Sequence, residues 1–160
     1  MSFHTFDQNG KPLVLFFTVR SELSNFFPCI FHDPNSGLRF NCNEQLNVMA
    51  VVMACDSPRD QKEIGKRVVG FRQQKWDTVS RDVMKKGLLL KFGSNKRLKD
   101  ILVGTNEAIL AEPSPFDRRW GIGLDAADPK ARDTREWKGE NRLGAVLMEV
   151  RSMLREVRHQ

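Results

Sequence analysis

The sequence predicts an α+β fold that is mainly helical, in a single domain with a small N-terminal β-sheet or hairpin. Three observations lead to this fold class. Runs of β-forming residues concentrate in the first 42 positions. Apolar residues recur at helical spacing from residue 44 onward. Since no repeat, linker or low-complexity tract divides the 160 residues, we expect one domain over residues 1–160.

The N-terminal β element is expected from two short runs. Leu13–Phe17 and Cys29–His32 are rich in residues that favour strands. A turn at Asp33–Gly37 leads into Leu38–Phe40 and predicts a hairpin. Between the two runs, Arg20–Pro28 is a polar and aromatic loop.

Two helices are expected next along the chain. Glu44–Cys55 is apolar nearly all round after its first turn, which is typical of a helix through the core, and Asn41 or Asn43 is available as its cap. Glu44 would then lie at the N-terminus of a buried helix. Ser57–Gly70 is polar and basic and forms the second helix.

The remaining helices are read from apolar stripes and stop signals. Thr78–Phe92 carries one apolar face and ends at Gly93. That face is formed by Val79, Val83, Met84 and Leu88. Ser94 is expected to cap a short helix that turns Leu98, Ile101 and Leu102 inward. The last helix, Asn141–Arg158, repeats apolar residues in steps of three and four, and core packing is its expected role.

Composition limits the classes of partner. The net charge of +6 favours anionic ligands such as phosphates, but no basic run typical of a nucleic-acid-binding segment is present. The first residues lack a secretory signal pattern and the apolar run Val48–Cys55 is too short to cross a bilayer, so we expect a cytoplasmic protein without membrane contact. The three cysteines and three histidines have no metal-like spacing, which predicts no metal and no cofactor.

The segment from Glu112 to Gly123 predicts a ligand-binding loop. Its two prolines prevent a helix and its two glycines allow unusual backbone conformations. Trp120 offers a flat surface, Arg118 or Arg119 offers a cation, and Asp117 faces a polar or reactive atom. A phosphorylated nucleoside fits these three groups. The alternative is a solvated loop with a half-buried tryptophan.

A larger set of residues resembles the NADAR family, also called YbiA-like, across about residues 16–152. The set comprises Leu23–Phe27, Glu44, Trp76, Met84, Lys91–Phe92, Thr105, Glu112, Asp117, Trp120–Gly123, Gly139, Asn141, Gly144, Leu147, Met148 and Arg151. The resemblance implies a YbiA-like fold and a metal-independent N-glycosidase that cleaves the bond between a ribose C1′ and a nitrogen. It implies either of two substrates, a phosphoribosylamino-pyrimidine intermediate of riboflavin synthesis or ADP-ribosylated guanine. The implied partner is therefore a phosphorylated nucleoside-like small molecule or an ADP-ribosylated nucleic acid.

On this resemblance the two catalytic residues are Glu44 and Asp117. Cleavage of a ribosyl C–N bond passes through an oxocarbenium-like state, so a carboxylate near C1′ stabilises the cation and orients or deprotonates water. Glu44 is expected in this role, and its alternative is a charge that complements a helix dipole. Asp117 would share the acid/base work or hold ribose hydroxyls, and its alternative is an Asx turn or loop cap.

Seven residues are expected to bind substrate: Asn25, Trp76, Trp120, Arg20, Arg118, Arg119 and Gly121. The tryptophans would stack the base or exclude water, and both have the alternative of a core role. Asn25 would form hydrogen bonds with the ribose or with a base edge, and its alternative is to form a turn. The arginines are candidate phosphate contacts or ordinary surface charges. Asn141 is expected to set the start of the last helix, and Gly144 to permit close packing.

Two departures from the family pattern keep other functions open. Gln45–Asn47 stands where many relatives have histidine and aromatic residues, and the chain contains no tyrosine. One alternative is therefore a non-catalytic module that binds ADP-ribose or NAD. The second alternative is a nucleic-acid-associated protein, and the net charge of +6 supports it.

Overall fold

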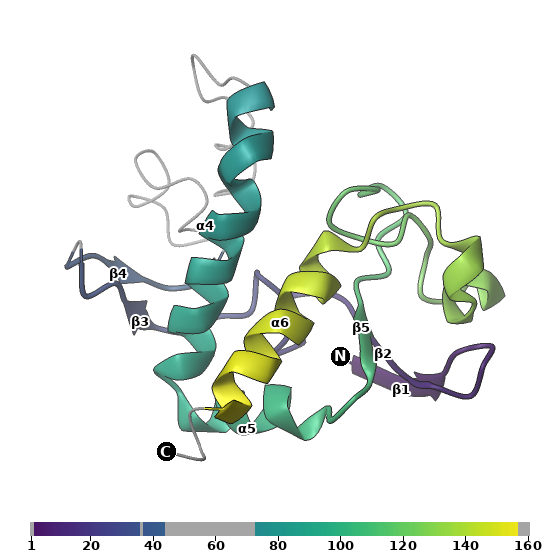
Figure 1. The fold of residues 1–160 in the computed structure, drawn as a ribbon, viewed down its shortest axis with the longest axis horizontal. Helices are drawn as coiled ribbons and strands as arrows, with labels where there is room; N and C mark the ends of the chain where they lie inside the picture. The colour runs from purple at the N-terminus through teal and green to yellow at the C-terminus, as the bar shows by residue number, and fades with distance from the viewer. Residues whose placement is uncertain (1, 36, 44–72, 157–160) are drawn as a thin grey trace.

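A computed structural model describes residues 2–35, 37–43 and 73–156 (Figure 1). Its elements are β1 (Ser2–Phe6), β2 (Pro12–Phe16), β3 (Phe31–His32), β4 (Arg39–Phe40), α4 (Gln73–Gly93), α5 (Lys96–Gly104), β5 (Ile109–Ala111), the 3-10 turns η1 (Pro129–Arg132) and η2 (Thr134–Glu136), and α6 (Arg142–Glu156). Long helices combined with small sheets confirm the predicted α+β, mainly helical class. The expected helices at 44–55 and 57–70 lie outside the described residues.

The larger sheet has the strand order β1-β2-β5. β1 pairs antiparallel with β2, as expected for neighbouring strands joined by a tight turn. β5 pairs parallel with β2, with Leu13 opposite Ile109. This strand was not predicted, because three residues carry too little alternation to be recognised in the sequence.

β2 is buried on both faces, which explains its unbroken apolar sequence. Side chains of a strand alternate between the two faces of a sheet. Val14 and Phe16 therefore enter the main core, whereas Leu13 and Leu15 enter a second, smaller core. The predicted strand at Leu13–Phe17 is confirmed, one residue earlier than expected.

The predicted hairpin is present as β3 and β4. Phe31 pairs with Phe40, and their rings stack with centroids 5.4 Å apart. The Gly37 N–H donates to the Asp33 carbonyl at 2.9 Å, and the Asn35 N–H donates to the Asp33 carboxylate at 3.1 Å. These bonds close the turn that the Asp-Pro-Asn-Ser-Gly segment predicted.

α4 begins five residues before its predicted start and ends at Gly93 as predicted. Its buried stripe runs through Ser80, Met84, Leu88 and Phe92 in steps of four. Val79 was expected on this stripe, but it is 47% exposed. A neighbouring position on a helix is rotated by about 100°, and this places Val79 off the buried face.

The expected cap of α5 is wrong by one residue. The Asn95 side chain accepts from the Leu98 N–H at 3.1 Å and is the N-cap. The Ser94 hydroxyl instead donates to the Leu90 carbonyl at 2.6 Å, within the last turn of α4. Leu98 and Leu102 are buried as predicted, whereas Ile101 is half-buried.

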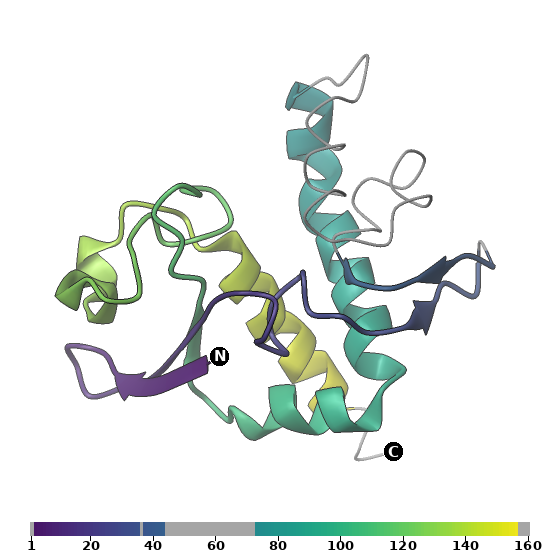
Figure 2. The same cartoon turned by 180° about the vertical axis from the view of Figure 1, so that it is seen from behind.

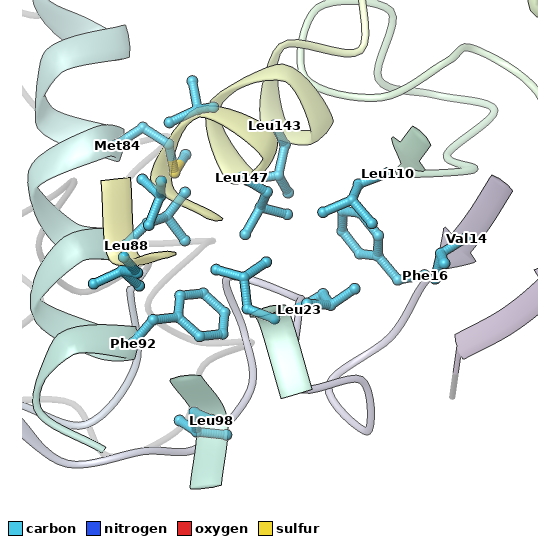
Figure 3. Packing of buried hydrophobic residues seen from close by; sticks show 14 of the residues in the cluster. Val14, Phe16, Leu23, Met84, Leu88, Phe92, Leu98, Leu110, Leu143 and Leu147 are labelled. Atoms are coloured by element: carbon cyan, nitrogen blue, oxygen red, sulfur yellow. The ribbon is translucent and has the colours of Figure 1, made fainter. Parts of the chain in front are cut away.

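The main core lies where α4, α5 and α6 meet β2 and β5. In Figures 1 and 2, α6 lies between α4 and β5, and α6 contacts both of them. Figure 3 shows Met84, Leu88 and Phe92 of α4 facing Leu143 and Leu147 of α6, with Phe16 of β2 and Leu110 of β5 on the far side. Burial of this apolar surface is the main stabilising contribution to the fold.

The contact between α6 and β5 requires a glycine. A Cβ built on Gly144 overlaps the Leu110 carbonyl oxygen and lies 2.5 Å from the Asn141 side-chain nitrogen. The predicted close packing at Gly144 is therefore confirmed, and the neighbour is the backbone of the central sheet. α6 begins at Arg142, one residue after its predicted start, because Asn141 has a positive φ of 51°.

Gly144→Ala is expected to lower the free energy of unfolding by about 1–3 kcal/mol, because the added methyl group forces α6 away from a backbone that cannot yield. Gly104→Ala is the matched control. It lies in α5 with no atom within 4 Å of the added carbon, so it should be neutral or stabilising by up to about 1 kcal/mol. Urea denaturation of both variants measures the difference. Equal effects would contradict the close approach of α6.

Candidate active site

The predicted ligand-binding loop is held in place by the segment that leads into α6. Five backbone hydrogen bonds join them: Lys138 N to Ile122 O (2.9 Å), Glu140 N to Arg118 O (2.8 Å), Asn141 N to Gly121 O (3.1 Å), Arg142 N to Arg119 O (3.2 Å) and Leu143 N to Trp120 O (3.1 Å). The first amides of a helix have no partner within the helix. Here the carbonyls of the loop accept from them, so the position of the loop depends on α6.

The side chain of Asn141 links the same loop to the sheet through two hydrogen bonds. Its Nδ2 donates to the Leu110 carbonyl at 2.8 Å, and its Oδ1 accepts from the Glu112 N–H at 3.2 Å. Asparagine tolerates the left-handed backbone conformation that this position adopts. β5, the loop and α6 therefore meet at one buried amide.

Asp117 uses one carboxylate oxygen to shape the loop. Its Oδ1 accepts from the Arg119 N–H at 2.9 Å and from the Trp120 N–H at 2.8 Å. This geometry is the Asx turn that was weighed against a catalytic role. No described residue pairs with Oδ2, and the residue is half-buried. One oxygen is therefore structural, and the other is available to a ligand.

Gly121 is required by the loop itself. An added Cβ would lie 2.9 Å from both the Asp117 and the Glu112 carbonyl oxygens, closer than real Cβ contacts come. The sequence suggested that a ligand comes close to the glycine, but in the structure the carbonyl groups of Asp117 and Glu112 occupy that space. Gly123 adopts a φ of 71°, and the stem of Arg118 packs beside it.

The three candidate arginines differ in their partners. Arg119 forms an ion pair with Asp77 of α4. Arg118 and Arg20 are exposed, and neither forms an ion pair with any residue that the structure describes. Of the two arginines in the loop, Arg118 is therefore the one whose guanidinium is free to meet an anion.

Two tryptophans were expected near the ligand. Trp120 is half-buried and packs against the main core, so one part of its ring remains accessible. Trp76 lies in α4, and its side chain is outside the description. Asp77 is the next residue, so its ion pair with Arg119 brings this part of α4 to the loop.

Asn25 connects to the residue before the expected catalytic acid. Its Oδ1 accepts from the Asn43 Nδ2 at 3.0 Å, and that group also lies 3.2 Å from the Met84 sulfur. Glu44 follows directly and lies outside the described residues. In the sequence Asn43 was only a possible helix cap, and nothing in the sequence pointed to its contact with Asn25.

Two buried polar atoms near this contact have no partner among the described residues. They are the Oδ1 of Asn43 and the hydroxyl of Ser80, which lies one turn before Met84 on α4. Buried polar groups in proteins are nearly always hydrogen-bonded, and exceptions often mark functional positions.

Lys91 is a buried cation that the sequence analysis left without a role. Its ammonium donates to the Ser24 carbonyl at 2.6 Å, and it lies 5.5 Å from the centroid of the Phe27 ring and 4.9 Å from that of Phe92. Burial lowers the pKa of Lys91 to about 8, partly offset by Cys29 and other groups. Burial also raises the pKa of the neighbouring Cys29 thiol. The hydrogen bond from Lys91 thus links Ser24, the residue before Asn25, to α4.

An open hollow of about 380 Å³ lies elsewhere on the surface. It is lined by Asp33, Pro34, Asn35, Asp82, Lys85, Lys86, Leu89 and Leu90. None of the candidate residues whose side chains the structure describes lines it. Within the described ranges, no helix is long and apolar enough to cross a membrane, and no three His, Cys, Asp or Glu side chains are grouped to hold a metal ion.

Comparison with known proteins gives a match to the NADAR domain over residues 16–155. The chain is 32% identical to protein irg-1 of Caenorhabditis elegans, over 92% of this chain and 82% of that protein. It is 37% identical to N-glycosidase R617 of Acanthamoeba polyphaga mimivirus, over 62% of this chain and 59% of that protein. The NMR structure of the E. coli protein YbiA superposes with a TM-score of 0.73 at 25% identity, over 92% of this chain and 88% of that one.

Lys91→Met is expected to change how stability depends on pH. The pKa falls from its ordinary 10.5 to about 8 on folding, so the folded chain bears the full cost of the buried charge below pH 8. That cost disappears as the pH rises from about 8 to 10.5. The free energy of unfolding of the wild type, relative to the variant, should therefore rise by about 3 kcal/mol over this range.

Urea denaturation at a series of pH values measures this difference. Lys96→Met is the control for loss of a lysine, because the Lys96 side chain is 88% exposed. A difference between wild type and Lys91→Met that does not change with pH would contradict a buried ammonium.

Proposed function

Because the chain belongs to the NADAR family, we propose that it hydrolyses the ribose C1′–N bond of a phosphorylated or ADP-ribosylated nucleobase. A relative of 37% identity bears the name N-glycosidase, and the chain is accordingly a hydrolase that acts on N-glycosyl bonds. The observation that carries the proposal is the Asx turn at Asp117. The turn holds the Asp117 carboxylate in the same loop that carries the half-buried Trp120 and the exposed Arg118.

In the proposed reaction Glu44 is the principal acid. Its carboxylate stabilises positive charge as the C1′–N bond breaks, and it orients the attacking water. The contact of Asn25 with Asn43 supports this assignment, because it holds the backbone immediately before Glu44. The leaving base takes up a proton as it departs, and the water oxygen becomes the new C1′ hydroxyl.

Asp117 is proposed to hold the ribose. Its Oδ1 already accepts two backbone amides, so Oδ2 is the oxygen that can accept from a ribose hydroxyl or from water. The turn restrains the side chain before substrate arrives, so little entropy is lost when the contact forms. Structural and functional roles of this residue are thus compatible.

Trp120 and Arg118 are proposed to bind the base and the phosphate. The half-buried indole presents a rigid flat face at low entropic cost. Arg118 supplies a cation, whereas Arg119 is engaged by Asp77. Asn25 and Trp76 are proposed to complete the surroundings of the base, and Arg20 remains a further candidate for the phosphate.

Glu44→Gln is expected to reduce kcat by roughly 10²–10⁴-fold, because it removes the charge and little else. Asp117→Asn should keep Oδ1 in the turn but lose charge at Oδ2, raising KM more than it lowers kcat. Asp125→Asn is the matched control, since the Asp125 Oδ1 accepts from the Ala127 N–H at 2.8 Å in a similar turn just after the end of this loop. Chromatography of products from a phosphoribosylamino-pyrimidine and from an ADP-ribosylated guanine oligonucleotide measures the rates.

The same experiment separates the proposal from its alternatives. Release of free base or of ADP-ribose by the wild type, and its loss in Glu44→Gln, supports hydrolysis and names the substrate. Binding of ADP-ribose with no product from either substrate would instead establish a non-catalytic reader. Full activity of Glu44→Gln would show that Glu44 is not the catalytic carboxylate.

Arg118→Ala is expected to raise KM for the cleaved substrate by roughly 10–150-fold, the cost of losing a hydrogen bond to a charged phosphate. Arg132→Ala is the control, because Arg132 is equally exposed and unpaired among the described residues but lies in η1. Steady-state kinetics of the two variants measure the effect. An equal, small change in both would show that Arg118 acts only through net charge.

A further inference from the structure

The Phe116 side chain projects from the candidate loop into solvent. It is 97% exposed, and the next most exposed large hydrophobic residue in the described part of the chain is Phe6, at 62%. Single hydrophobic residues on a surface are common and need no explanation in general. An almost completely exposed ring directly before Asp117, however, lies at the edge of the proposed substrate site.

Phe116 is exposed from a loop whose backbone is closed by hydrogen bonds. Within the loop, the Ser114 and Ile122 N–H groups both donate to the Glu112 carbonyl at 2.9 Å. Pro115 restricts the backbone immediately before Phe116. On the other side, Asp117 closes its turn with two hydrogen bonds. The backbone around Phe116 is therefore restrained from both sides, and the ring is held in solvent.

The loop has two aromatic rings at two different depths. Trp120 packs against the core and remains half-accessible, whereas Phe116 contacts almost nothing. Asp117 lies between them in sequence, and Arg118 adds an exposed cation that no described residue pairs with. A ligand whose reacting base lies on Trp120 would need a second flat group further out to use Phe116.

The possible substrates differ in the flat groups that they offer to Phe116. A phosphoribosylamino-pyrimidine has one base, and that base is taken by the inner position. An ADP-ribosylated guanine carries the adenine of its ADP-ribose in the nucleoside and in the polynucleotide alike, whereas only the single-stranded polynucleotide adds a neighbouring base and a linking phosphate. Aromatic side chains stack on such bases without sequence preference, and nearby guanidinium groups bind the backbone.

We propose that Phe116 is a stacking residue for the nucleotide adjacent to the target base in a single-stranded polynucleotide substrate. Arg118 contacts the phosphate between the two nucleotides. This inference rests on the proposed function and adds to it a residue that selects polymeric over monomeric substrates. The net charge of +6 agrees with a polyanionic ligand.

The test compares one modified base in two contexts, ADP-ribosylated guanine within a single-stranded oligonucleotide and the corresponding ADP-ribosylated guanosine. Phe116→Ala is expected to lower the ratio of kcat/KM for the oligonucleotide over the nucleoside by roughly 5–150-fold. Phe116→Trp should retain the wild-type ratio, because it keeps a ring. Phe6→Ala, on β1, is the matched control for removal of an exposed phenylalanine and should leave the ratio unchanged.

Equal losses on both substrates, or no loss on either, would overturn the proposal. A second measurement is independent of catalysis: fluorescence anisotropy with a labelled, unmodified single-stranded oligonucleotide. Phe116→Ala should weaken this binding by a similar factor, whereas Phe6→Ala should not. Undetectable binding by the wild type, or equal affinity of wild type and Phe116→Ala, would overturn the stacking role. Failure of the wild type to release free base or ADP-ribose from any substrate would overturn the proposed function alone.

Discussion

The structure around the candidate site depends on the buried side-chain amide of Asn141. This amide donates to the last strand of the central sheet and accepts from the first residue of the candidate loop. Its backbone N–H donates to the Gly121 carbonyl at 3.1 Å, and its carbonyl accepts the first hydrogen bond of α6, from Ala145, at 3.0 Å. A side-chain amide donates from its nitrogen and accepts at its oxygen, and of the two amide residues asparagine readily takes a positive φ. Sheet, loop and helix are therefore positioned by the same residue.

A loop built in this way presents side chains without being free to move. Its carbonyls accept from the first amides of α6, and Asp117 and Gly121 close it internally. Groups held in their working geometry before a ligand binds lose little entropy on binding. The same restraint explains the two arginines. The loop brings Arg119 against Asp77 on α4, and it leaves Arg118 in solvent.

Buried polar groups join α4 to the segment around Asn25. Lys91 reaches the Ser24 carbonyl from α4, and Asn43 reaches Asn25. Burying a lysine without a carboxylate partner is unfavourable unless its ammonium is hydrogen-bonded, and here a carbonyl and two aromatic rings partly compensate for lost hydration. The oxygens of Asn43 and Ser80, which have no partner among the residues that the structure describes, add to this cost. Well-packed apolar residues in place of buried charged groups are often neutral or stabilising, so stability alone does not account for these polar groups.

The sequence by itself determined the class of fold, the β3–β4 hairpin, the end of α4 and the buried face of α6, because each depends on spacing and turn chemistry within a few residues. It also determined that Glu112–Gly123 is a loop rich in potential ligand contacts, and its pattern identified the family. Only the tertiary structure decided how those contacts are used. Strand β5 exists because β2 lies beside it, Arg119 is engaged because α4 approaches the loop, and Asn43 matters because Asn25 folds onto it. These pairings join positions 18 to 96 residues apart, and local residue patterns carry no information about them.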